Sequence, residues 1–322
     1  MKSVVAKLFK IDRQPKKGLL ALEWVMVIYL ILTLLYAFFM HTKLVNPDAI
    51  IWGRVRVVAM TALLWFVYRL LPCRITMFVR VFVQFLLLGW WYPDTYELNR
   101  VLPNLDHVFA QWEQDWFGCQ PALLFSQKFS SAFWSELFDL AYVSYFPMIL
   151  VVLTYIFMAR YEEFERASFI VIAAFFIYYA IYIVLPVVGP TFYYKAVGVK
   201  NILAGVFPNM HDYFNYHQDC LPSPGYTDGF CYQLLVDAHE AGERPTAAFP
   251  SSHVGITTVL MWLLLHVRQY KLFWWLFPVY ILLCCSTVYI QAHYLVDSLA
   301  GFVTGTLFYF VLLYASKDMR YK

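Results

Sequence analysis

The most informative shortage in this sequence is charge. Only 14% of the 322 residues are Asp, Glu, Lys or Arg, whereas a soluble domain usually has about 25%. In their place stand 61% hydrophobic and 20% aromatic residues, and Tyr and Trp favour lipid–water interfaces. The composition excludes an ordinary soluble domain and predicts an all-α polytopic membrane protein.

Several other features are also missing. The net charge of +3 is too small to indicate a nucleic-acid partner. Neither a tandem repeat nor a low-complexity tract is evident. A cleavable signal peptide is not expected, because the first apolar run is long enough to span and has no small-residue cleavage site.

What the chain does have is eight apolar runs near spanning length. They cover residues 20–40, 50–71, 75–92, 138–158, 168–188, 252–267, 272–291 and 294–315. The sixth run is short, which predicts a helix whose first turn is recessed and lines a polar pocket. With the N-terminus inside, fifteen Lys and Arg residues fall on the cytoplasmic side and eight on the outer side. The positive-inside rule therefore places both termini in the cytoplasm.

This reading divides the chain into four parts. We expect a basic cytoplasmic N-terminus over 1–19, two accessory transmembrane helices over 20–71, a core over 75–315 and a cytoplasmic tail over 316–322. Within the core, residues 93–137 alternate aromatic and charged residues and predict short amphipathic helices on the membrane surface. Residues 189–249 are polar and irregular enough either to cover a site as a lid or to serve as a plain connector.

The six cysteines are divided between the two environments. Cys73, Cys284 and Cys285 fall in or beside spans, where reduced thiols are the simplest expectation. Cys119, Cys220 and Cys231 are predicted outside. If that side is oxidising, a Cys220–Cys231 disulfide is an option, with Cys119 as a competing partner.

Two short motifs bring histidines to the outer ends of spans. FPSSH, residues 249–253, ends on His253 where an apolar run begins, and Pro250 with two serines favours a helix start there. STVYIQAHYLVD, residues 286–297, carries His293 and Asp297 four apart, which on a helix would put them on one face. Two spans joined by a short basic turn separate the histidines, so both should meet at the same membrane surface.

These motifs resemble the second and third signatures of the type 2 phosphatidic acid phosphatase (PAP2) superfamily. The matching positions are Pro250, Ser251, His253, Ser286, His293 and Asp297. The resemblance implies a six-helix core preceded by two extra N-terminal spans. It also implies that His293 is a nucleophile forming a phosphohistidine, that Asp297 orients it, and that His253 acts as acid and then base. No metal or cofactor is implied.

The departures from the family pattern concern the phosphate-binding cations. Thr287 stands where the third motif usually has Arg, and the first motif, K-x6-R-P, survives only as Arg244-Pro245, with Asp237 in place of the Lys. We therefore predict that Arg244, then Lys195 and Lys200, meet the phosphate charge. Backbone N–H groups at Ser251, Ser252 and His253 would add an anion seat, although the two serines could be plain helix caps.

The eroded first motif and the two extra spans resemble the inositol phosphorylceramide synthase branch. That branch implies transfer of a phosphoryl headgroup from a phospholipid donor, such as phosphatidylinositol, to the hydroxyl of a ceramide-like acceptor. The active site would face the periplasm or a secretory lumen. The alternatives are a hydrolase of the same fold, acting on phosphatidate or a polyprenyl diphosphate, and a non-catalytic transporter. A zinc site built from His253, His293 and Asp297 is a more distant option.

Overall fold

The fold is entirely helical over the residues that the computed structural model describes, 8–12 and 15–319. In that part of the chain the only strand-like pairing is one isolated bridge between Ile11 and Cys73. The helices are α2 (Ala21–Phe39), α3 (Pro47–Leu70), α4 (Arg74–Asn99), α5 (Asp106–Phe117), α6 (Pro121–Lys128), α7 (Ala132–Val143), α8 (Tyr145–Ala159), α9 (Tyr161–Val184), α10 (Pro190–Val197), α11 (Val199–Leu203), the 3-10 turn η1 (Tyr213–Asn215), α12 (Phe230–Gly242), α13 (Ser252–His266), α14 (Tyr270–Tyr289) and α15 (Leu295–Ala315). The predicted fold class is confirmed.

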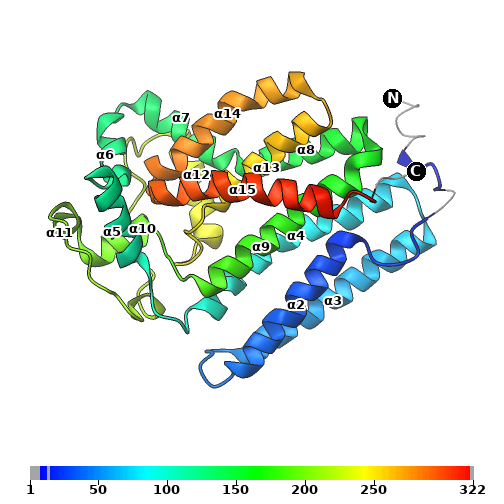
Figure 1. The fold of residues 1–322 in the computed structure, drawn as a ribbon, viewed down its shortest axis with the longest axis horizontal. Coiled ribbons are helices and arrows are strands. Elements are labelled where there is room, and N and C mark those ends of the chain that lie inside the picture. Colours follow the sequence, from blue (N-terminus) through cyan, green and yellow to red (C-terminus); the bar gives the residue numbers. More distant parts are fainter. Residues whose placement is uncertain (1–7, 13–14, 320–322) are drawn as a thin grey trace.

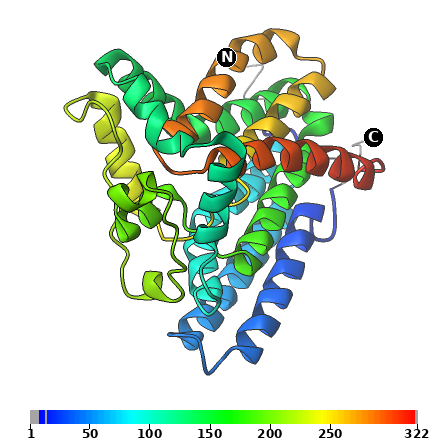
Figure 2. The same cartoon turned by 60° about the vertical axis from the view of Figure 1, so that its left-hand side comes forward.

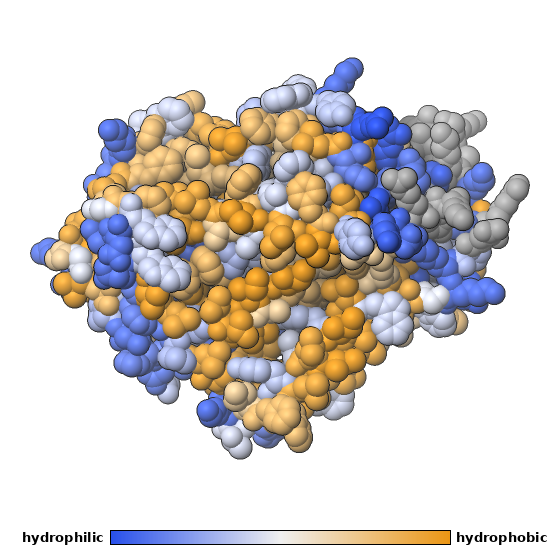
Figure 3. Space-filling view, in the orientation of Figure 1, coloured by the Kyte–Doolittle hydropathy of each residue, from blue (hydrophilic) through white to orange (hydrophobic). Residues whose placement is uncertain are grey.

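Each of the eight predicted spans corresponds to one helix or to a pair of helices. Within the described residues, α2, α3, α4, α9, α14 and α15 are long and apolar enough to cross a membrane. The fourth run is broken into α7 and α8, which meet at 48°. The sixth is α13, whose 15 residues rise about 22 Å, less than the ~30 Å hydrocarbon core. Apolar side chains cover the middle of the molecule, with hydrophilic groups gathered toward both ends (Figure 3).

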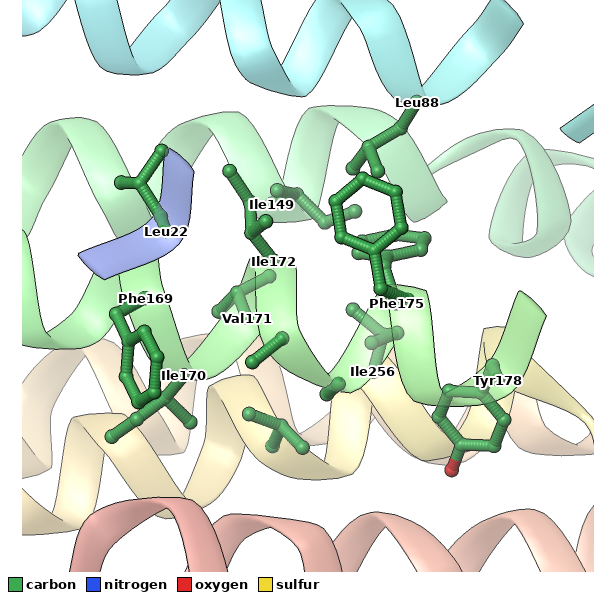
Figure 4. Close-up of a cluster of buried hydrophobic side chains, with 14 of the residues drawn as sticks. Leu22, Leu88, Ile149, Phe169, Ile170, Val171, Ile172, Phe175, Tyr178 and Ile256 are labelled. Atoms are coloured by element: carbon green, nitrogen blue, oxygen red, sulfur yellow. The ribbon is translucent and has the colours of Figure 1, made fainter. Parts of the chain in front are cut away.

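Helix α9 lies at the centre of the bundle. After its charged first turns its sequence is apolar on all sides, which is typical of a buried helix, and 17 of its 24 residues are buried. It packs against α2, α4, α8, α13 and α15. Figure 4 shows Ile170, Val171, Ile172 and Phe175 of α9 pointing into the surrounding helices.

Two buried ion pairs fasten the N-terminal helices α2 and α3 to α4. Arg54 of α3 donates to both carboxylate oxygens of Asp94 at 3.1 and 2.9 Å. Arg80 of α4 donates through Nε to Glu23 of α2 at 2.6 Å. All four side chains are almost fully buried, and in an apolar interior such charges are tolerated only when paired.

Both ends of the helical part of the chain lie at the same end of the bundle. Helix α2 begins and α15 ends on the right of Figure 1, while α5, α6, α10 and α11 gather at the left. Figure 2 turns this second end forward and shows the extramembrane helices packed around it. This arrangement fits an even number of crossings. The assignment of one end to the cytoplasm stays a prediction.

The second long connection, over residues 189–249, is more regular than the sequence suggested. Residues 189–249 contain α10, α11, η1 and α12, and they are broken into short helices because Gly189 and Gly198 adopt φ values of 94° and 88°, which favour glycine. The segment is also fastened to α7, since Glu136 accepts the Cys231 and Tyr232 N–H groups at 3.0 and 3.1 Å.

Candidate active site

Two adjacent helices bring the motif histidines together. His253 is the second residue of α13, and His293 lies in the turn between α14 and α15, two residues before α15 begins. Helices α13 and α15 pack closely because a glycine faces the start of α13. A Cβ atom at Gly301 would lie only 2.4 Å from the Ser251 carbonyl oxygen.

The imidazoles face each other at the end of the bundle. His293 Nε2 lies 3.5 Å from His253 Nδ1, and the ring centroids are 5.6 Å apart. His293 is 4% exposed. The structure therefore places the two predicted residues within reach of one small group, as the motif spacing implied.

The tautomer of His293 follows from its second nitrogen. Nδ1 lies 2.8 Å from the carbonyl oxygen of Ala248. A carbonyl can only accept, so Nδ1 carries the proton and neutral His293 keeps its lone pair on Nε2. Burial lowers the pKa of His293 to about 4, so the ring is neutral at physiological pH. The free lone pair therefore points toward His253, which is the arrangement that a nucleophile requires.

Asp297 is close to His293 but is not its closest partner. Its Oδ2 lies 3.6 Å from His293 Nδ1 and accepts the Tyr294 N–H at 2.8 Å, while Oδ1 is buried with no hydrogen-bond partner. The expectation that His293 and Asp297 share one face of a helix is wrong, because His293 precedes α15. Asp297 lies in the first turn of α15 and caps it. The carboxylate can still stabilise a positive charge on His293 through space.

The predicted anion seat at the start of α13 is partly engaged by the protein itself. The Ser251 N–H donates to the Asp297 carbonyl at 3.0 Å, and the Ser252 N–H donates to the Tyr182 hydroxyl at 3.0 Å. Ser251 Oγ caps the helix by accepting the Val254 N–H at 3.4 Å. Both serines therefore serve as structural parts of the helix start, and their predicted role in phosphate binding stays a prediction.

His253 is enclosed by aromatic rings. Tyr142 of α7 stacks on it with centroids 4.7 Å apart, and Tyr145 of α8 lies at 4.4 Å. Behind Tyr142 is His239 of α12, with ring centroids 5.8 Å apart. His239 Nδ1 lies 3.0 Å from Glu243. His239 therefore packs in helix α12 against a wall of the site.

The comparison with protein families agrees with this geometry. A family model described as the PAP2 superfamily matches residues 107–311, more than half of the chain. The chain belongs to the PAP2 superfamily. No curated protein and no solved structure gives a match.

Membership of the PAP2 superfamily supports the general class of reaction, which is phosphate-ester hydrolysis or phosphoryl transfer. The match covers FPSSH and STVYIQAHYLVD and extends from α5 to α15. It begins after α4, so the predicted start of the core at residue 75 stays a prediction. The inositol phosphorylceramide synthase-like branch is a finer assignment than this match supports.

In the described part of the chain, none of the three cations predicted to bind phosphate forms a hydrogen bond with His253 or His293. Lys195 and Lys200 are exposed on α10 and α11. Arg244 is also exposed, and its Nη1 donates to the Glu243 carbonyl at 3.2 Å. Arg244 has an indirect link to the site. It binds the carbonyl of Glu243, whose side chain contacts His239, and His239 packs against Tyr142.

Residues of α5 that carry no motif support the PAP2 site from outside the bundle. Buried Asp106 accepts the Val188 and Gly189 N–H groups at 2.7 and 2.9 Å and the Tyr294 hydroxyl at 3.1 Å. Buried Glu113 accepts the Val296 N–H at 2.9 Å. These carboxylates hold the turn that presents His293. Helix α5, predicted as a surface helix, therefore also shapes the site.

Cysteines and metal ligands add little to the site. All six cysteines, including Cys220 and Cys231, are free thiols in the structure, so the disulfide is not formed there. Among the described residues, no group of three or more His, Cys, Asp or Glu side chains is arranged to hold a metal ion.

Proposed function

We propose that this PAP2 protein is a membrane lipid phosphotransferase that works through a phosphohistidine on His293. The observation that carries the proposal is the lone pair on His293 Nε2, which the Ala248 carbonyl leaves free by holding the proton on Nδ1. That lone pair faces His253, whose Nδ1 lies 3.5 Å away and can exchange protons with a group bound between the rings.

The reaction follows as two displacements at phosphorus. His293 Nε2 forms a bond to phosphorus and the phosphorus–oxygen bond to the lipid leaving group breaks. His253, which takes up a proton once the negative phosphate lies beside it, donates that proton to the leaving oxygen. In the second step an acceptor hydroxyl attacks phosphorus and His253 takes the hydroxyl proton. The nitrogen–phosphorus bond breaks, and the lone pair returns to His293. Asp297 stabilises the positive ring of the intermediate.

The enclosure of His253 supports transfer to a lipid hydroxyl over hydrolysis. Tyr142 and Tyr145 cover its faces, and His293 is almost completely buried. A phosphohistidine kept from bulk water survives until an alcohol arrives. We further propose phosphatidylinositol as the donor, a ceramide-like lipid as the acceptor and diacylglycerol as the product of the first step. These assignments rest on the eroded first motif, with Arg244 as the leading phosphate contact.

Purified protein incubated with inositol-labelled phosphatidylinositol, with and without ceramide, tests the proposal. We expect a labelled ceramide product only when ceramide is present, together with diacylglycerol. Equal release of free inositol phosphate in both mixtures would instead establish a hydrolase. Retention of the activity by His293→Ala would contradict the histidine mechanism for either class.

A further inference from the structure

An apolar groove runs into the membrane beside the candidate active site. It lies between α4, α8 and α9, and its volume is about 350 Å³. Thr154 supplies the only hydroxyl-bearing side chain in a lining that is otherwise aliphatic and aromatic. Figure 4 shows three of the lining residues, Leu88, Ile149 and Phe175, converging from these three helices.

Tyr145 connects this groove to His253. Its ring lies 4.4 Å from the His253 ring and 6.4 Å from the ring of Phe175, which lines the groove. The next residue, Phe146, also lines the groove. A molecule whose polar end lies at the histidines is therefore separated from the groove by the single ring of Tyr145.

The groove has the length of one membrane leaflet. Along α4 its lining extends from Phe78 to Leu88, ten residues or about 15 Å of helix. Half of a ~30 Å hydrocarbon core is the same length. Because α8 begins at Tyr145 beside His253, the groove deepens along α8 from Phe146 through Leu150 to Thr154, away from the histidines.

The outer wall of the groove is open to the surrounding lipid. Leu86 is 61% exposed, Phe146 66% and Leu150 48%. Two other apolar grooves lie on the accessory helices, one between α2 and α9 and one near the α2–α3 turn, but neither has a lining ring in contact with Tyr145, as Phe146 and Phe175 of the α4–α8 groove are. Of these three grooves, the α4–α8 groove is the one that is open to lipid at its side and separated from His253 by the single ring of Tyr145.

We propose that this groove, lined along its depth by Phe146, Leu150 and Thr154, binds one acyl chain of the phospholipid donor while its phosphate lies at His293. The inference rests on the proposed function and names the part of the donor lipid that the protein recognises besides the headgroup. Lipid tails are as apolar as the groove, so transfer from bilayer to groove contributes little free energy. The groove acts by positioning, because a chain held along α8 fixes the distance between the headgroup and His293 Nε2.

Filling the groove with a Trp side chain tests the inference through donor chain length. Leu150→Trp and Thr154→Trp should lower kcat/KM for a long-chain donor by about ten-fold or more and leave a short-chain donor within about two-fold of the wild type. Thr154 lies four residues, or about 6 Å, deeper than Leu150. Thr154→Trp should therefore accept intermediate chains that Leu150→Trp rejects. Leu32→Trp in the α2–α9 groove is the matched control and should change neither.

A binding measurement separates this inference from the proposed function. In the inactive His293→Ala protein, a phospholipid with a photoreactive group on its acyl chain should cross-link to peptides of α4 and α8, and Leu150→Trp should abolish that cross-link. Losses independent of chain length, or cross-links unaffected by Leu150→Trp, would overturn the groove assignment. An inactive wild-type protein that still cross-links at α4 and α8 would refute the proposed transferase and leave the groove intact.

Discussion

One backbone carbonyl sets the chemical state of His293. Ala248 O fixes the proton on Nδ1, so the nucleophilic lone pair on Nε2 does not depend on Asp297. The carboxylate caps α15 through the Tyr294 N–H, and in the proposed mechanism its second task is to stabilise the charge of a phosphorylated ring, from 3.6 Å away. This division of labour differs from a catalytic triad, in which the carboxylate itself selects the tautomer.

Asp297→Asn separates these roles. The Asn side-chain oxygen can still accept the Tyr294 N–H, so the helix cap survives, and the tautomer remains set by Ala248. We expect kcat to fall by about ten- to a hundred-fold through the lost negative charge. In Ser-His-Asp triads the same change costs about 10⁴-fold because the tautomer is wrong. Steady-state kinetics measures the difference, and a loss near 10⁴-fold would assign tautomer selection to Asp297.

At the scale of elements, the site depends on how closely α13 and α15 approach. Gly301 lies against the Ser251 carbonyl, at the position where α13 begins. Any side chain there pushes α13, which carries His253, away from α15, which directly follows the His293 turn. The packing of Gly301 against Ser251 therefore sets the separation of His253 and His293.

Gly301→Ala should reduce both stability and activity. Its methyl group would lie 2.4 Å from a backbone oxygen, and relief of such overpacking typically costs about 1–3 kcal/mol. Gly89→Ala in α4 is the matched control, since nothing lies within 4 Å of its added methyl. We expect thermal unfolding in detergent to show a lowered midpoint for Gly301→Ala and an unchanged or raised one for Gly89→Ala. Equal midpoints would show that the helices adjust freely.

The attachment of α5 to the start of α15 should depend on pH. Burial raises the pKa of Glu113 from 4.5 to about 8. A carboxyl with a raised folded-state pKa keeps its proton in the folded protein while the unfolded chain loses it, so stability falls as pH rises from about 4.5 to 8. Glu113→Gln removes this titration and keeps a side-chain acceptor for the Val296 N–H. Its unfolding midpoint should vary less over that range than the wild type's, and identical pH profiles would contradict the assignment.

At the scale of the whole molecule, the accessory helices are part of one packed bundle. Glu23 and Arg80 join α2 to α4, and Arg54 and Asp94 join α3 to α4. Removing one partner of a buried pair leaves an uncompensated charge, which costs about 3–5 kcal/mol.

Glu23→Ala should therefore destabilise the protein strongly, whereas Arg56→Ala should not, because Arg56 is exposed on α3. Denaturation in mixed micelles measures both. If Glu23→Ala unfolded like the wild type, α2 would have to be a loosely attached helix.

The sequence predicts the membrane class, the helix order and the approach of the two histidines, because hydropathy and motif spacing are local signals. It does not predict Ala248, since a carbonyl has no residue-type signature, or Tyr142 and Tyr145, whose contact with His253 depends on the 48° bend between α7 and α8. The carboxylates of α5 were missed for a related reason. Asp106 and Glu113 resemble the polar face of a surface helix until the fold turns them toward the His293 turn. The cations were predicted from a motif remnant, and that signal gives no position in space.

The central claim is that His293 carries the phosphoryl group, and trapping the intermediate tests it most directly. Protein quenched during turnover of a phosphorus-labelled donor should hold an acid-labile, alkali-stable label on the peptide that contains His293. His217→Ala, a change at an exposed histidine, should keep the label, and His293→Ala should lose both label and turnover. A label that persists in His293→Ala, or turnover that persists without it, would contradict the account.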